Sequence, residues 1–182
     1  MISVQAASPD CRKTPHGARH DGNPDSARLS EIALAASTGI DALSGLASDF
    51  LNQFNEVSML LDMAGDDIEL LEELNDWSPR GYAEHFEASN FRDSALVLEA
   101  YALCPSDTRA DFDQQSRELG AVILGGLESI RTAPGDAARV EAESQALAAD
   151  VRARIDALSA IIHPTEKPPS NAEIAAMFAS RR

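Results

Sequence analysis

Apolar residues recur at spacings of three and four between residues 29 and 61, as on one face of a helix. They are Leu29, Ile32, Ala36, Ile40, Leu43, Ala47, Phe50, Phe54, Val57 and Leu61. This alternation is typical of a coiled-coil seam and predicts one long helix that ends near Gly65. Gly39 and Gly45 each weaken a helix by up to about 1 kcal/mol, so the same pattern also permits a break near Gly45.

Two more apolar stripes with helical spacing follow Pro105 and predict two long helices. Ser106 is placed to be the N-cap of the first of these helices. The first stripe is Phe112, Leu119, Ile123, Leu127 and Ile130, and the second is Val140, Leu147, Val151, Ile155, Leu158 and Ile162. Between them, Thr-Ala-Pro-Gly-Asp at residues 132–136 has the composition of a turn. Two long helices joined by a short turn lie antiparallel, as an αα-hairpin. No segment alternates with period two long enough to indicate a strand, so the predicted fold is an all-α helical bundle.

The remaining segments complete the predicted domain organisation. Residues 1–26 are rich in proline, glycine and polar side chains, which predicts a disordered tail. The bundle spans residues 27–162 and contains an insertion of short helices at 66–104, predicted over residues 66–76, 82–89 and 93–103. A proline-rich linker at 163–170 separates it from a C-terminal docking peptide at 171–182, and His163 is expected to end the last bundle helix.

Five of the nine aromatic residues lie within this insertion: Trp77, Tyr82, Phe86, Phe91 and Tyr101. They form either a small core beneath the short helices or an exposed interaction patch. His85 lies among them, on a helix that also carries Glu84 and Glu87. Acidic and aromatic neighbours favour a buried or hydrogen-bonded structural histidine over a phosphoacceptor.

Charge limits the partners that this protein can bind. The chain has 30 acidic and 15 basic residues, and residues 29–130 alone carry 20 acidic and 4 basic ones. Such a body repels nucleic acids and anionic membranes and attracts basic protein surfaces. Two cysteines, Cys11 and Cys104, imply no disulfide framework. With no apolar run of membrane-spanning length and no signal-peptide core at the N-terminus, we expect a cytoplasmic bacterial protein.

The C-terminal peptide has the pattern of a short amphipathic helix. Ser170 and Glu173 are spaced as a capping box. Ile174, Met177 and Phe178 then fall on one face, with no apolar neighbour in sequence to cover it. Prolines hold the preceding linker extended. The segment is either a docking peptide for the groove of a partner or a helix that folds back on the body of the protein.

Two acid–amide pairs invite a chemical interpretation. Asp49 and Gln53 are four residues apart, and Asp111 and Gln115 repeat this spacing, which places each pair on one helical face. An amide can orient an attacking water, as glutamine does in GTP hydrolysis, while the acid holds a lysine of the partner. Acid–amide pairs are also common on solvated helix surfaces, so the spacing alone does not select a function.

The tail from Ser170 to Phe178 resembles the response-regulator-binding peptide shared by the flagellar switch protein FliM and the chemotaxis phosphatase CheZ. CheZ-type proteins are helical hairpins that dimerise as a four-helix bundle and carry an Asp-x-x-x-Gln signature. The resemblance implies that Glu173, Ile174, Met177 and Phe178 bind a phosphorylated CheY-like receiver. It further implies that Gln115 or Gln53 orients water, that Asp111 or Asp49 grips the partner, and that Mg²⁺ comes from the receiver rather than from a cofactor of this protein.

This sequence departs from the family pattern at Ala175, where an acidic residue is usual, and in the insertion at 66–104. We therefore expect a divergent chemotaxis protein that binds a receiver domain and promotes its dephosphorylation, with apolar seams on three helices that favour a homodimer. The alternatives are a non-catalytic adaptor, a phosphotransfer-like bundle in two-component signalling, and a purely structural helical oligomer. The position of Asp111 and Gln115 on a hairpin helix slightly favours that pair as the catalytic one.

Overall fold

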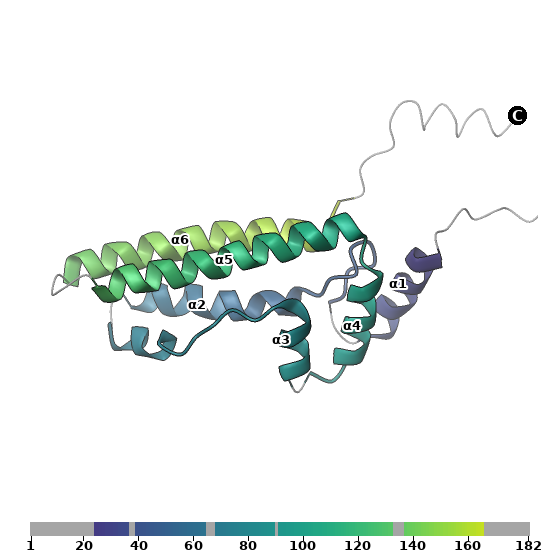
Figure 1. The fold of residues 1–182 in the computed structure, drawn as a ribbon, viewed down its shortest axis with the longest axis horizontal. Coiled ribbons are helices and arrows are strands. Elements are labelled where there is room, and N and C mark those ends of the chain that lie inside the picture. Colours follow the sequence, from purple (N-terminus) through teal and green to yellow (C-terminus); the bar gives the residue numbers. More distant parts are fainter. Residues whose placement is uncertain (1–23, 37–38, 65–67, 90, 133–136, 166–182) are drawn as a thin grey trace, which may run out of the picture.

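The computed structural model describes residues 24–36, 39–64, 68–89, 91–132 and 137–165, and every regular element in these ranges is a helix (Figure 1). The elements are α1 (Pro24–Ala35), the 3-10 helix η1 (Ser48–Leu51), α2 (Asn52–Met63), the 3-10 helix η2 (Ile68–Leu74), α3 (Tyr82–Ala88), α4 (Ser94–Leu103), α5 (Ser106–Thr132) and α6 (Ala137–Ile162). The all-α prediction is confirmed. None of the described helices is long and apolar enough to cross a membrane.

The predicted αα-hairpin is present as α5 and α6, which lie side by side along the length of the molecule (Figure 1). All eleven residues of the two predicted stripes are buried. The amide of Arg109 donates a hydrogen bond to the carbonyl of Pro105, which closes the first turn of α5. Ser106 is therefore the first residue inside the helix and not the N-cap that the sequence predicted.

The prediction of one long helix over residues 29–61 is wrong. The structure has α1 and α2 instead, separated by a loop whose residues Ile40 and Ala47 pair across a single antiparallel bridge. Asp41 starts the turn, because its carboxylate accepts hydrogen bonds from the backbone amides of Leu43 (2.8 Å) and Ser44 (3.1 Å).

Gly45 completes this turn with a φ of 73°, which favours glycine. A Cβ added there would lie 2.7 Å from the carbonyl oxygen of Ala100 in α4. The alternative prediction, a break of the helix near Gly45, is therefore correct. The close approach of α4 at Ala100 requires a glycine at this point of the turn.

The same loop closes the C-terminal end of α6. The Ser44 hydroxyl donates a 2.6 Å hydrogen bond to the carbonyl of Ile162 and accepts one from the amide of Leu46. One residue further, Nδ1 of His163 lies 3.3 Å from Oδ2 of Asp41. The bond from Ser44 occupies one of the carbonyls that a helix end leaves unpaired, and His163 ends the helix as predicted.

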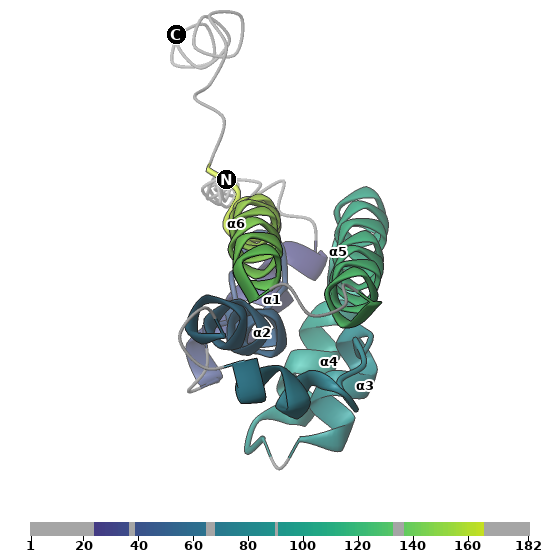
Figure 2. The same ribbon diagram turned by 90° about the vertical axis from the view of Figure 1, so that its left-hand side faces the viewer.

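Helix α6 packs against both α2 and α5, and Figure 2 shows these three helices end-on. The irregular segment 75–81 bridges α2 and α5. The Pro79 ring fills the space beside Gly120 of α5, where a Cβ would lie 2.7 Å from two ring carbons. The Trp77 ring meets that of Phe54 in α2, with centroids 6.3 Å apart. Segment 75–81 thus takes the position that a fourth helix has in a bundle.

The aromatic residues of the insertion join the main core. Tyr82 and Phe86 are buried, and the Tyr82 ring stacks on Tyr101 at 4.5 Å between centroids. Tyr82 also contacts the rings of Phe50 and Phe112 from two other elements, and its hydroxyl accepts a 2.7 Å bond from the amide of Ala47. The core interpretation is correct for these residues, although the core is continuous with the bundle and not a separate cluster.

Several predictions concern residues that the structure does not describe. Pro24, Asp25 and Ser26, placed in the predicted tail, form the first turn of α1, while residues 1–23 lie outside the described ranges. The linker is described as far as residue 165. The docking peptide at 171–182 lies outside the described residues, and with it Glu173, Ile174, Met177 and Phe178.

Candidate functional site

The amides of the two acid–amide pairs line different surface pockets. Gln53 lines an open pocket of about 340 Å³ between α2 and segment 75–81. Asp111 and Gln115 line another of about 480 Å³ between α5 and α6, and the two pockets share no residue. The pairs are therefore separate candidates, and each is assessed by what its amide contacts.

The amide of Gln53 is engaged by the protein itself. Its oxygen accepts a 3.0 Å hydrogen bond from the backbone amide of Arg80, and its nitrogen donates to the carbonyl of the same residue at 3.3 Å. Both ends of the side chain thus fasten segment 75–81 to α2. Asp49 belongs to the 3-10 turn η1, one element before Gln53, and does not line the Gln53 pocket. This arrangement gives Gln53 a structural role.

His85 lies at the same pocket, half-buried between aromatic rings. Its ring centroid is 5.5 Å from that of Phe50 and 5.0 Å from that of Phe86. Burial lowers the pKa of the imidazole and the positive charge of Arg80 lowers it further, whereas Asp49 raises it by less. A histidine kept neutral among apolar rings agrees with the structural interpretation made from the sequence.

The second pair is more accessible. On α5, Nε2 of Gln115 donates a 2.9 Å hydrogen bond to Oδ1 of Asp111, and Asp111 is exposed. The neighbouring Gln114 makes the same kind of bond, 2.9 Å long, to Glu118 in the opposite direction along the helix. The prediction that Asp111 and Gln115 share one helical face is confirmed, because their side chains are hydrogen-bonded to each other on the surface of α5.

Helix α6 supplies the other wall of this pocket, through Asp150, Ala153, Arg154 and Ala157. Nε of Arg154 lies 3.2 Å from Oδ1 of Asp150, one turn earlier, and both side chains are about half exposed. Sequence reasoning missed this wall. The signal available was an acid and an arginine four residues apart between small alanines on a hairpin helix, and many solvated helices share it.

The formal charge of this pocket is negative. Asp111, Glu118 and Asp150 contribute carboxylates, and Arg154 is the one cation among the residues that line it. Over the described part of the chain, no three His, Cys, Asp or Glu side chains are grouped closely enough to hold a metal ion. The pocket offers two amides, three carboxylates and a guanidinium, which suits binding and orientation more than covalent chemistry.

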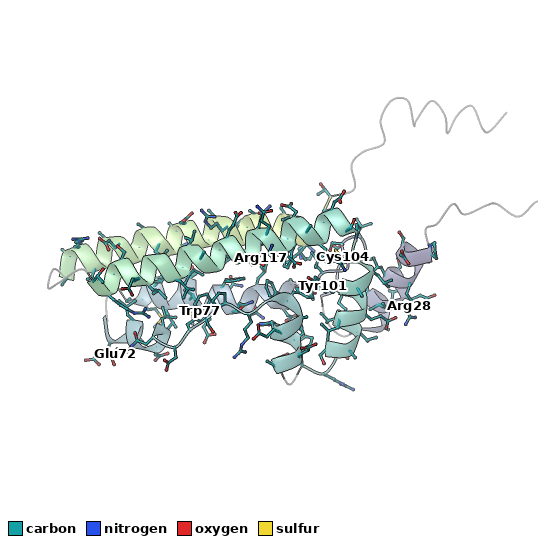
Figure 3. The ribbon with its side chains drawn as sticks, in the orientation of Figure 1. Arg28, Glu72, Trp77, Tyr101, Cys104 and Arg117 are labelled. Carbon is teal, nitrogen blue, oxygen red and sulfur yellow. The ribbon has the colours of Figure 1, made fainter. Side chains whose placement is uncertain are left out.

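The described cysteine, Cys104, is a free, buried thiol at the junction of α4 and α5 (Figure 3). Burial raises its pKa to about 11, so the thiol is protonated near neutral pH and is a poor nucleophile. Figure 3 also places Trp77 in the segment that passes alongside α5.

The structure thus defines the protein as an all-α protein with a long helical hairpin and an acid–amide pocket on its outer surface. Comparison with family models, with curated proteins and with solved structures finds no match for this chain.

Proposed function

We propose that this protein binds a phosphorylated receiver domain of the CheY type and promotes hydrolysis of its aspartyl phosphate. In this proposal Gln115 orients the attacking water and Asp111 holds both the amide and a basic residue of the partner. The observation that carries it is the 2.9 Å bond between these side chains on the open surface of the hairpin. The tail residues Glu173, Ile174, Met177 and Phe178 would recruit the receiver.

The chemistry asks little of the helper protein. A phosphorylated receiver already holds the phosphoryl group and the Mg²⁺ ion, so an amide at the right point is enough to align water for attack. With Nε2 bound to Asp111, the oxygen of the Gln115 amide is the atom that can accept a hydrogen bond from water. A long helix packed through its buried stripe keeps this atom in place.

The contacts of Gln53 argue against the rival pair. Its amide would have to leave the backbone of Arg80 before it could meet a partner, and segment 75–81 would lose a connection to α2. Gln115 needs no such rearrangement, because its partner Asp111 lies on the same exposed helix surface.

A phosphate-release assay with CheY, Mg²⁺ and acetyl phosphate tests the proposal. We expect the intact protein to accelerate phosphate release and Gln115→Ala to lose about a hundredfold of that acceleration, as for other single polar groups that act in a transition state. Gln114→Ala is the matched control, because this neighbour lines the same pocket and also bonds to an acid one turn away. Gln53→Ala should retain the acceleration where the fold is intact.

Three outcomes would each overturn a part of this proposal. Equal acceleration by wild type and Gln115→Ala would remove the catalytic role of this residue, and a loss in Gln53→Ala alone would move the site to the other pocket. Binding of the receiver without acceleration by the wild type would favour the adaptor. Truncation after Pro169 should abolish receiver binding if the tail recruits the partner.

A further inference from the structure

The pocket beside Gln115 has an electrostatic mismatch with the substrate proposed for it. Three carboxylates line it, and a phosphorylated aspartate would bring more negative charge to the same place. Like charges that meet at a protein interface cost several kcal/mol unless a cation lies between them. Arg154 is the one cation in the pocket lining, and it projects from the helix opposite Gln115.

The present contact of Arg154 is easily exchanged. Its Nε meets one oxygen of Asp150 at 3.2 Å, and the side chains are 40% and 49% exposed. Ion pairs of this exposure contribute little to stability, because water screens them and side-chain entropy opposes them. A guanidinium has five donors in a planar fork, of which this contact uses one, so donors remain for an anionic ligand.

Small neighbours leave room for such a ligand. Ala153 and Ala157 line the pocket beside Arg154, and both are exposed. A partner surface can therefore approach α6 closely beside Arg154, which lines the same pocket as Gln115.

From this charge arrangement we infer that Arg154 is a second functional residue of the site, which binds the phosphoryl oxygens of the receiver domain. This inference rests on the proposed function and deepens it. The water oxygen forms the new bond to phosphorus, the bond to the aspartate oxygen breaks, and the aspartate leaves as a carboxylate, while both protons of the water remain on the inorganic phosphate that is released. Arg154 keeps its protons and neutralises charge on the phosphoryl oxygens, while Asp150 holds it in place before the partner arrives.

Arg152 offers a matched control on the same helix. It is an exposed arginine, paired with Asp62 of α2, and it does not line the pocket. In the phosphate-release assay we expect Arg154→Gln to lower the maximal acceleration at least tenfold, with Arg154→Lys partly restoring it and Arg152→Gln within twofold of wild type. Circular dichroism and urea midpoints close to wild type would show that the variants are folded.

A binding measurement separates this role from catalysis. Beryllium fluoride mimics the phosphoryl group on CheY, so titrations with and without it give the preference of the protein for the activated receiver. We expect Arg154→Gln to lose at least fivefold of this preference, and Gln115→Ala to keep it.

The outcomes distinguish the two claims. Loss of acceleration in Gln115→Ala with Arg154→Gln unchanged in both assays would overturn the role of Arg154 and leave the proposed function standing. Absence of acceleration by the wild type, together with no preference for the activated receiver, would overturn both. Equal losses in Arg154→Gln and Arg152→Gln would show a general charge effect and would also overturn the inference.

Discussion

Pro79 rests against Gly120 so closely that its ring occupies the space where a side chain on α5 would begin. A Cβ at Gly120 would lie 2.7 Å from two carbons of the ring. The rigid ring cannot rotate away, so the backbone of segment 75–81 would have to shift. We expect Gly120→Ala to lower the free energy of unfolding by about 1–2 kcal/mol, although alanine favours helix by about 1 kcal/mol.

Gly125 is the control, because it is an exposed helical glycine of α5 at which an added Cβ would meet no atom within 4 Å. Gly125→Ala should raise the free energy of unfolding by up to about 1 kcal/mol. Urea unfolding of both variants gives the comparison, and a stabilised Gly120→Ala protein would show that segment 75–81 does not pack on α5 as described.

Gln53 supplies a second prediction about segment 75–81. Gln53→Ala removes both hydrogen bonds to the backbone of Arg80 and leaves those groups to solvent, since Arg80 is exposed. We expect a loss of about 1 kcal/mol in unfolding free energy. Asn52→Ala, at an exposed neighbouring position, should change the free energy by less than about 0.5 kcal/mol. Faster proteolysis within residues 75–81 of Gln53→Ala would locate the effect.

Ser144 of α6 is fully buried, and its hydroxyl has no hydrogen-bond partner within the described part of the chain. Ser144→Ala removes this unpaired group, so we expect an increase of about 1 kcal/mol in unfolding free energy. Ser116→Ala is the comparison, because Ser116 is also buried in a helix and donates a 3.1 Å bond to the carbonyl of Asp113. Helix propensity changes equally in both variants. Equal effects in the two variants would contradict the prediction.

The two tyrosines make stability fall at alkaline pH. Burial raises the pKa of Tyr82 well above its usual range, and burial followed by the hydrogen bond to Asp113 raises the pKa of Tyr101 to about 12. Unfolded tyrosine titrates near pH 10, so deprotonation favours the unfolded state above that pH. The free energy of unfolding should be unaffected by these groups below about pH 10 and decrease as the pH rises toward 12.

Tyrosinate absorbance measures this directly, since the chain contains no other tyrosine. The absorbance should rise together with loss of the helical signal instead of at pH 10. Tyr101→Phe should show a smaller decrease in stability over the same range. Titration of both tyrosines near pH 10 in the folded protein would contradict the burial of Tyr82.

The hairpin could be predicted from sequence because each stripe keeps helical spacing along nearly the whole of its helix. The pattern from Leu29 to Leu61 correctly predicted most of the buried residues, but it wrongly predicted that they belong to one continuous helix. Leu29, Phe54 and Leu61 are all buried, yet they belong to two helices that face one core. Two residues of the pattern are exceptions: Leu43 is 48% exposed in the turn, and Ala36 is only partly buried. Periodicity indicates which residues face the core. It does not show a turn when the segments on both sides of the turn direct their apolar residues toward the same core.

The turn itself depends on contacts that spacing does not reveal. Glycine is required at position 45 because a Cβ there would lie only 2.7 Å from the carbonyl oxygen of Ala100, a residue far away in sequence. The candidate site follows the same rule. The Asp111–Gln115 bond is local and could be predicted. Arg154 lines the pocket only because α6 folds back beside α5, and the amide of Gln53 is engaged only because the backbone of Arg80 lies next to it.

The packing of α2 on α6 also determines when the protein can fold during its synthesis. Helix α2, which begins at Asn52, packs mainly against α6, and Ser44 donates a hydrogen bond to Ile162, the last residue of α6. In a nascent chain, the face of α2 that packs on α6 therefore stays uncovered until α6 has emerged from the ribosome. The core between these two helices can therefore close only after α6 has been synthesised, at a rate limited by closure of this long loop.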